Sequence, residues 1–150
     1  MNRRKKYIFI VLVVLWTLFI WNNSLAPSDE SSMQSGWILN LIDSIMGSLP
    51  FGDSTEFVVR KAAHMFEFFV LAILWCNLIP YYCEDGRWKL LIPFGLTVVT
   101  AMADETIQLH VPGRSGEVRD VCVDATGALI GIVLFLIILK LRKRKTADEG

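Results

Sequence analysis

The chain has 150 residues, of which 53% are hydrophobic, and its mean hydropathy is positive. This composition is too apolar for an ordinary soluble domain of this length, so runs of roughly 20 apolar residues, the length that spans a bilayer, have to be sought first. The formal net charge is zero, and the three cysteines have no paired spacing, which argues against a disulfide-stapled secreted fold.

Four runs are apolar enough to cross a membrane. They cover approximately residues 7–26, 57–79, 88–109 and 121–139. No internal repeat and no low-complexity tract interrupts them. The sequence therefore predicts an all-α polytopic membrane protein with four transmembrane helices, organised as a single domain over residues 1–150.

Basic residues predict the orientation of these spans. RRKK precedes the first run, KLRKRK begins at residue 140 after the last, and together with the 80–89 connection these segments hold eleven of the fifteen basic residues. Positive charge beside helix ends stays in the cytoplasm. Both termini are therefore predicted to be cytoplasmic, with 140–150 as a basic tail. Because the tails adjoin apolar helices, they are expected to contact anionic lipid rather than nucleic acid.

The first run allows a second interpretation. RRKK followed by an apolar stretch and SLA resembles a cleavable signal peptide. Trp16, Trp21 and Pro27 fit an uncleaved anchor better, and cleavage would leave the remaining topology unchanged.

The connection over 22–56 is expected on the outer side. Within it, apolar residues recur at helical spacing and predict a helix lying in the outer membrane interface; these are Ile38, Leu41, Ile42, Ile45 and Leu49. A helix that caps the bundle would show the same pattern, so both interpretations stay open. DSTE at 53–56 then indicates the start of the second span.

Charged residues inside the apolar runs gather at one depth. Arg60, His64 and Glu67 are spaced i, i+4, i+7 on one face of the second span. Asp104, Glu105 and Gln108 lie in the last turns of the third span, and Asp120 and Asp124 in the first turns of the fourth. All belong to the predicted outer half of the membrane. Asp124 is followed by GALIG, a GxxxG element that lets helices approach closely and is expected to face the bundle.

Two interpretations of these charges remain. They are either internal ion pairs that hold three helices in register or the lining of a polar pocket open to the outside. Ionisable groups at membrane depth are costly and usually mark functional sites, and buried pairs add little stability. A pocket is therefore favoured. Arg60, Lys61 and Arg114 suit a phosphate or carboxylate head group at the outer leaflet.

Catalysis is a competing hypothesis. Glu67 with His64 as partner is a candidate general acid or base, and Asp104 and Asp124 are further catalytic candidates. His64 and Glu67 at i, i+3 also have metal-ligand spacing, but the motif is common and the other histidine, His110, is in a loop, so no metal ion and no cofactor are assigned.

The motifs RK-x-x-H-x-x-E, DE-x-x-Q-x-x-x-x-GR and D-x-x-x-D-x-x-G, within residues 24–131, together resemble the VanZ-like family of small bacterial membrane proteins. The family commonly has tyrosine where Phe68 follows the glutamate here. The resemblance implies a four-helix protein related to a teicoplanin-resistance factor. It places ligand-binding positions at Arg60, Lys61, His64, Glu67, Asp104, Glu105, Gln108, Arg114, Asp120 and Asp124.

We expect a multi-pass protein of the bacterial cytoplasmic membrane that is linked to glycopeptide or lipoglycopeptide resistance. Its partners are expected to be the bilayer and an envelope lipid, a lipid-linked wall precursor or the drug itself. One alternative is an acid–base or metal-assisted enzyme acting on an outer-leaflet lipid or wall precursor. A second is a structural accessory membrane subunit.

Overall fold

The computed structural model describes residues 3–27, 36, 53–114 and 116–148. Within these ranges the chain forms four long helices, α1 (Arg3–Leu25), α3 (Asp53–Leu78), α4 (Trp88–Gln108) and α5 (Val118–Asp148), and the short 3-10 helix η1 (Ile79–Tyr81) continues α3. Each long helix is long and apolar enough to cross a membrane. The predicted all-α architecture with four spans is confirmed. The predicted interfacial helix lies almost entirely outside the described residues.

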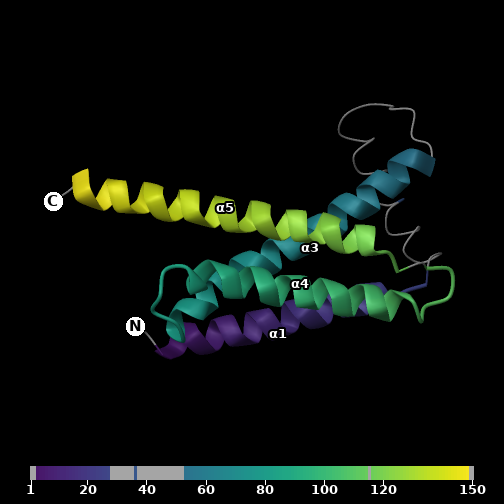
Figure 1. Ribbon diagram of the computed structural model, residues 1–150, viewed down its shortest axis with the longest axis horizontal. Coiled ribbons are helices and arrows are strands. Elements are labelled where there is room, and N and C mark those ends of the chain that lie inside the picture. Colours follow the sequence, from purple (N-terminus) through teal and green to yellow (C-terminus); the bar gives the residue numbers. More distant parts are fainter. Residues whose placement is uncertain (1–2, 28–35, 37–52, 115, 149–150) are drawn as a thin grey trace.

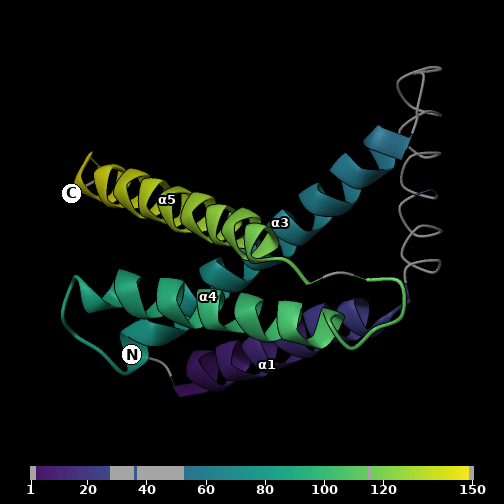
Figure 2. The same cartoon turned by 45° about the vertical axis from the view of Figure 1, so that its right-hand side comes forward.

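The four helices form an open bundle (Figure 1). α1 and α4 run in one direction, and α3 and α5 run in the other. α3 and α4 each contact the other three helices, whereas α1 and α5 lie on opposite sides of them, as the turned view also shows (Figure 2). Consequently one end of the bundle, termed the polar end, contains the last residues of α1 and α4 and the first residues of α3 and α5.

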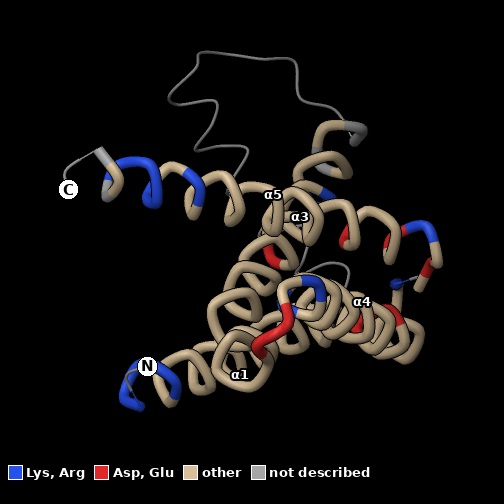
Figure 3. Tube along the Cα trace, turned by 60° about the vertical axis from the view of Figure 1, so that its left-hand side comes forward, with Lys and Arg blue, Asp and Glu red and all other residues tan. Residues whose placement is uncertain are grey.

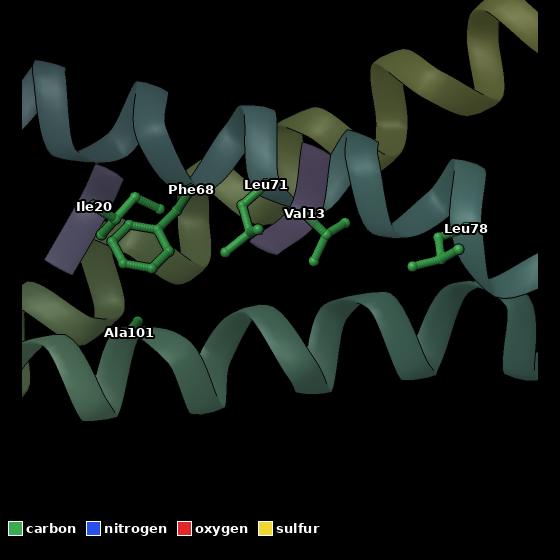
Figure 4. Packing of buried hydrophobic residues seen from close by; sticks show 6 residues of the cluster. All are labelled: Val13, Ile20, Phe68, Leu71, Leu78 and Ala101. Carbon is green, nitrogen blue, oxygen red and sulfur yellow. The ribbon is translucent and has the colours of Figure 1, made fainter. Parts of the chain in front are cut away.

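The core lies where α1, α3 and α4 meet (Figure 4). Ile20 of α1, Phe68 and Leu71 of α3 and Ala101 of α4 are buried together there. Phe68 is fully buried among apolar side chains, which accounts for a residue without a hydroxyl at this position. Large apolar side chains also remain exposed along every long helix, as expected for helices whose outer surfaces contact lipid.

The GxxxG element of α5 packs directly against α3. A Cβ atom placed on Gly127 would collide with the backbone carbonyl of Met65, and one on Gly131 would press on the backbone of Phe69 one turn further along. Both glycines therefore allow two helix backbones to touch. The expectation that this element faces the bundle is confirmed.

Helix α5 is longer than the predicted span. It continues from the apolar run through the basic segment to Asp148, so most of the expected 140–150 tail is helical. Lysine and arginine are good helix formers, and neither proline nor glycine interrupts residues 140–148. Figure 3 shows that the basic start of α1 and the basic end of α5 lie at the same end of the bundle, opposite the polar end.

Candidate functional site

A cavity of about 350 Å³ opens at the polar end of the bundle. Its walls come from the first turns of α3, the end of α4, the α4–α5 loop and the first turns of α5. The lining residues are Phe57, Arg60, Lys61, His64, Glu105, Gln108, Gly113, Arg114, Glu117, Arg119, Asp120 and Asp124. The cavity thus brings together residues that are up to 67 positions apart in sequence, from Phe57 to Asp124.

Eight of the ten residues that the sequence predicts for ligand binding line this cavity. The other two, Glu67 and Asp104, are absent from its lining. Asp104 is completely buried and Glu67 lies one helical turn beyond His64, further from the polar end. The predicted set is therefore divided into a cavity wall and a more deeply placed polar group.

Asp104 is held by a compact hydrogen-bond network. The Ser24 hydroxyl donates to Asp104 Oδ2 over 2.7 Å, and Gln108 Nε2 donates to the same oxygen over 3.0 Å. Gln108 Nε2 also lies 3.4 Å from Glu105 Oε1. Because Asp104 and Gln108 are four residues apart on α4, one helix face supplies two members of the network, and Ser24 brings in the end of α1.

Glu67 is also hydrogen-bonded to α1. Asn23 Nδ2 donates to Glu67 Oε1 over 2.8 Å, and the indole N–H of Trp16 donates to the Glu67 backbone carbonyl over 2.9 Å. Asn23 and Ser24 are site residues that the motifs and charge pattern of the sequence do not predict. The available signal was the polar NNS directly after the first apolar run, at the same depth as the other polar groups.

His64 faces Asp104 rather than Glu67. His64 Nδ1 lies 4.0 Å from Asp104 Oδ2, and the described contacts include no hydrogen bond between His64 and Glu67. Since His64 also lines the cavity, its imidazole can exchange protons with a bound molecule. Within the described part of the chain, no three His, Cys, Asp or Glu side chains are placed to hold a metal ion.

Two contacts tie the walls of the cavity together. Lys61 of α3 forms an ion pair with Asp120 of α5. Glu105 Oε2 of α4 accepts a hydrogen bond of 2.9 Å from the Glu117 backbone N–H, just before α5. These contacts join α3 and α4 to the start of α5, so the three helices that line the cavity are linked to one another.

The α4–α5 loop carries Arg114 back towards α1. Gly113 takes a positive φ of 76°, the left-handed conformation that glycine adopts without strain. Arg114 Nε then donates to the Ala26 carbonyl over 3.0 Å, and Nη2 donates to the Asn23 carbonyl over 3.3 Å. Burial and the neighbouring Arg60 lower the pKa of the Arg114 guanidinium, which stays charged because an arginine titrates far above neutral pH.

Nearly all of this architecture lies within the range that matches a known protein family. The model of the VanZ/LLP1 family matches residues 9–139, a range that includes the cavity, the Asp104 network and most of the apolar part of every long helix. No curated protein and no solved structure gives a significant match. The match extends over well more than half of the chain and agrees with the motifs described above, and the chain therefore belongs to the VanZ/LLP1 family.

Proposed function

We propose that this protein resides in the bacterial cytoplasmic membrane, that its polar cavity opens to the outer face, and that the cavity binds an envelope lipid, a wall precursor or a glycopeptide drug. The family membership supports a link to glycopeptide or lipoglycopeptide resistance. A protein of this kind would act by binding a molecule at the membrane surface where such drugs act. The bound molecule would then be kept from its other partners.

The distribution of basic residues supports this orientation. The start of α1 and the end of α5 carry most of them and lie at the end opposite the cavity (Figure 3). Under the positive-inside rule this basic end faces the cytoplasm. The cavity then lies at the outer leaflet, where lipid head groups and wall precursors are within reach.

The observation that carries the proposal is the set of cations in the cavity wall. Arg60, Lys61, Arg114 and Arg119 all line it, although ionisable groups are rare in membrane helices and usually mark functional sites. Lys61 is paired with Asp120, whereas Arg60 forms no ion pair with any side chain whose placement the structure describes. A guanidinium presents two parallel donors to a phosphate or carboxylate, so Arg60 suits the anionic group of a ligand.

Replacing Arg60 with glutamine is expected to abolish the resistance that the wild-type gene confers, while the amount of protein in the membrane stays unchanged. Glutamine keeps much of the side-chain length but removes the charge and the bidentate donor. The measurement is the minimal inhibitory concentration of teicoplanin, with immunoblotting of membranes. Arg87→Gln, at the opposite end of the bundle, is the matched control and should behave like the wild type. Full resistance in Arg60→Gln would contradict the proposal.

A labelling experiment tests the orientation. In a chain whose three native cysteines are replaced by alanine, a single cysteine at exposed His110 should react with a membrane-impermeant maleimide in intact cells. A single cysteine at exposed Glu84, in the connection between η1 and α4, should react only after the membrane is permeabilised. The reverse pattern would place the cavity on the cytoplasmic side and contradict the proposed location.

A further inference from the structure

The cavity is lined by carboxylates as well as by cations. Four carboxylate side chains stand beside the four basic ones, so the formal net charge of the described lining is zero. A wall of this kind is poorly matched to a purely anionic ligand, because such a ligand would approach negative groups as closely as positive ones. The charge balance instead suits a ligand that carries both a positive and a negative charge.

Most of these carboxylates already have partners within the protein. Asp120 is paired with Lys61. Glu105 accepts from the Glu117 backbone N–H and lies within hydrogen-bond distance of Gln108 Nε2. These groups stabilise the walls, and a ligand would have to displace existing contacts to use them.

Asp124 differs from the other carboxylates of the cavity. Its side chain is only 1% exposed, it lines the cavity, and its Oδ2 atom has no hydrogen-bond partner among the described residues. A buried acceptor without a partner is costly to maintain. Its position, one helical turn beyond Asp120 on the same face of α5, makes it a deep acceptor within the cavity.

The surroundings of Asp124 favour a positively charged donor. Glu67 Oε2 and Asp104 Oδ1 are also buried without hydrogen-bond partners among the described residues, so carboxyl groups from α3, α4 and α5 each leave one oxygen without a donor. A neutral hydroxyl would satisfy one hydrogen bond, whereas an ammonium group would also offset the negative potential.

We propose that the cavity takes a zwitterionic amphiphile, whose phosphate or carboxylate contacts Arg60 while its primary ammonium group donates to Asp124. The inference rests on the proposed binding function and specifies its ligand class. Two sources offer this chemistry: a phospholipid with a phosphoethanolamine head group, and a glycopeptide drug, which carries amine and carboxylate groups.

The test compares head groups that differ in one property. Purified full-length protein in a non-ionic detergent is mixed with dihexanoyl phosphatidylethanolamine, phosphatidylcholine or phosphatidylglycerol, and bound lipid is measured by native mass spectrometry. Phosphatidylcholine keeps the positive charge but has no N–H donor. The ethanolamine lipid should bind about tenfold more tightly than the choline lipid, the factor expected for one charge-assisted hydrogen bond.

Two variants separate this inference from the broader function. Asp124→Asn should lower ethanolamine-lipid binding to the choline-lipid level and leave phosphatidylglycerol unchanged, whereas Arg60→Gln should weaken all three lipids. Asp85→Asn, in the connection at the opposite end, is the control. Size-exclusion chromatography checks folding, and the comparison of head groups on the wild-type chain does not depend on any variant.

The drug is tested in a parallel arm with teicoplanin and N-acetylated teicoplanin. Preference for the free amine, lost in Asp124→Asn, would identify the drug as the source of the ammonium group; preference for the ethanolamine lipid alone would identify the lipid. Equal binding of amine and blocked forms in both arms would overturn the zwitterion inference and leave the proposed function intact. Absence of binding of every lipid and of the drug to the wild type would overturn both.

Discussion

Replacing Gly127 with alanine is expected to lower the free energy of unfolding of the bundle by about 1–3 kcal/mol, the usual cost of overpacking a close contact. The added Cβ would collide with the backbone carbonyl of Met65, and a backbone atom cannot move aside by changing rotamer. Leucine at this position is expected to prevent α3 and α5 from packing and to abolish the folded protein. Reversible unfolding in mixed detergent micelles, followed by circular dichroism, measures both effects.

Gly95→Ala is the matched control for this prediction. Gly95 also lies within a long helix, α4, but a Cβ atom placed there would meet no atom within 4 Å. In a helix interior alanine is preferred over glycine by about 1 kcal/mol, so the same substitution should be neutral or stabilising. If Gly127→Ala also proves neutral, α3 and α5 are not packed backbone to backbone at that contact.

The overall architecture could be predicted from the sequence because the bilayer constrains it so strongly. Apolar runs of sufficient length predict spans, and a GxxxG element aligned with Asp120 and Asp124 predicts a face that packs on another helix. The ends of the helices could be predicted only less accurately. Residues 140–148 continue α5 because helix formation there depends on local propensity and not on apolar character.

The cavity wall could be predicted for a similar reason. Charges within apolar runs must face away from lipid, so Arg60, Lys61 and Asp124 were expected to converge. The participation of α1 could not be predicted, because Asn23 and Ser24 are uncharged and lie beyond the apolar run, where they resemble ordinary turn residues. Their roles depend on the tertiary contact between the end of α1 and Asp104 and Glu67.

The contact with α1 indicates a structural role for Asp104, whereas its position in the sequence motif suggested a ligand-binding role. From sequence it could not be distinguished from Asp124, since both are aspartates in polar turns of a membrane helix. In the structure Asp124 lines the cavity, whereas Asp104 is absent from the lining and accepts hydrogen bonds from two helices. We therefore expect substitutions at Asp104 to act first on stability and only indirectly on binding.

Asp104→Ala is expected to destabilise the protein by about 2–5 kcal/mol, because the buried Ser24 hydroxyl would lose its acceptor and the Gln108 amide would lose its shortest hydrogen bond. Asp104→Asn retains one oxygen of similar position, so we expect it to cost less than half as much. Unfolding in mixed micelles gives both free energies, and lipid binding is measured on the surviving folded fraction. If Asp104→Ala were as stable as the wild type yet bound no lipid, Asp104 would be a direct ligand contact, as its position among the family motifs suggested. The expected outcome, lost stability with binding preserved in Asp104→Asn, makes it the residue that holds α1 and α4 together beneath the cavity.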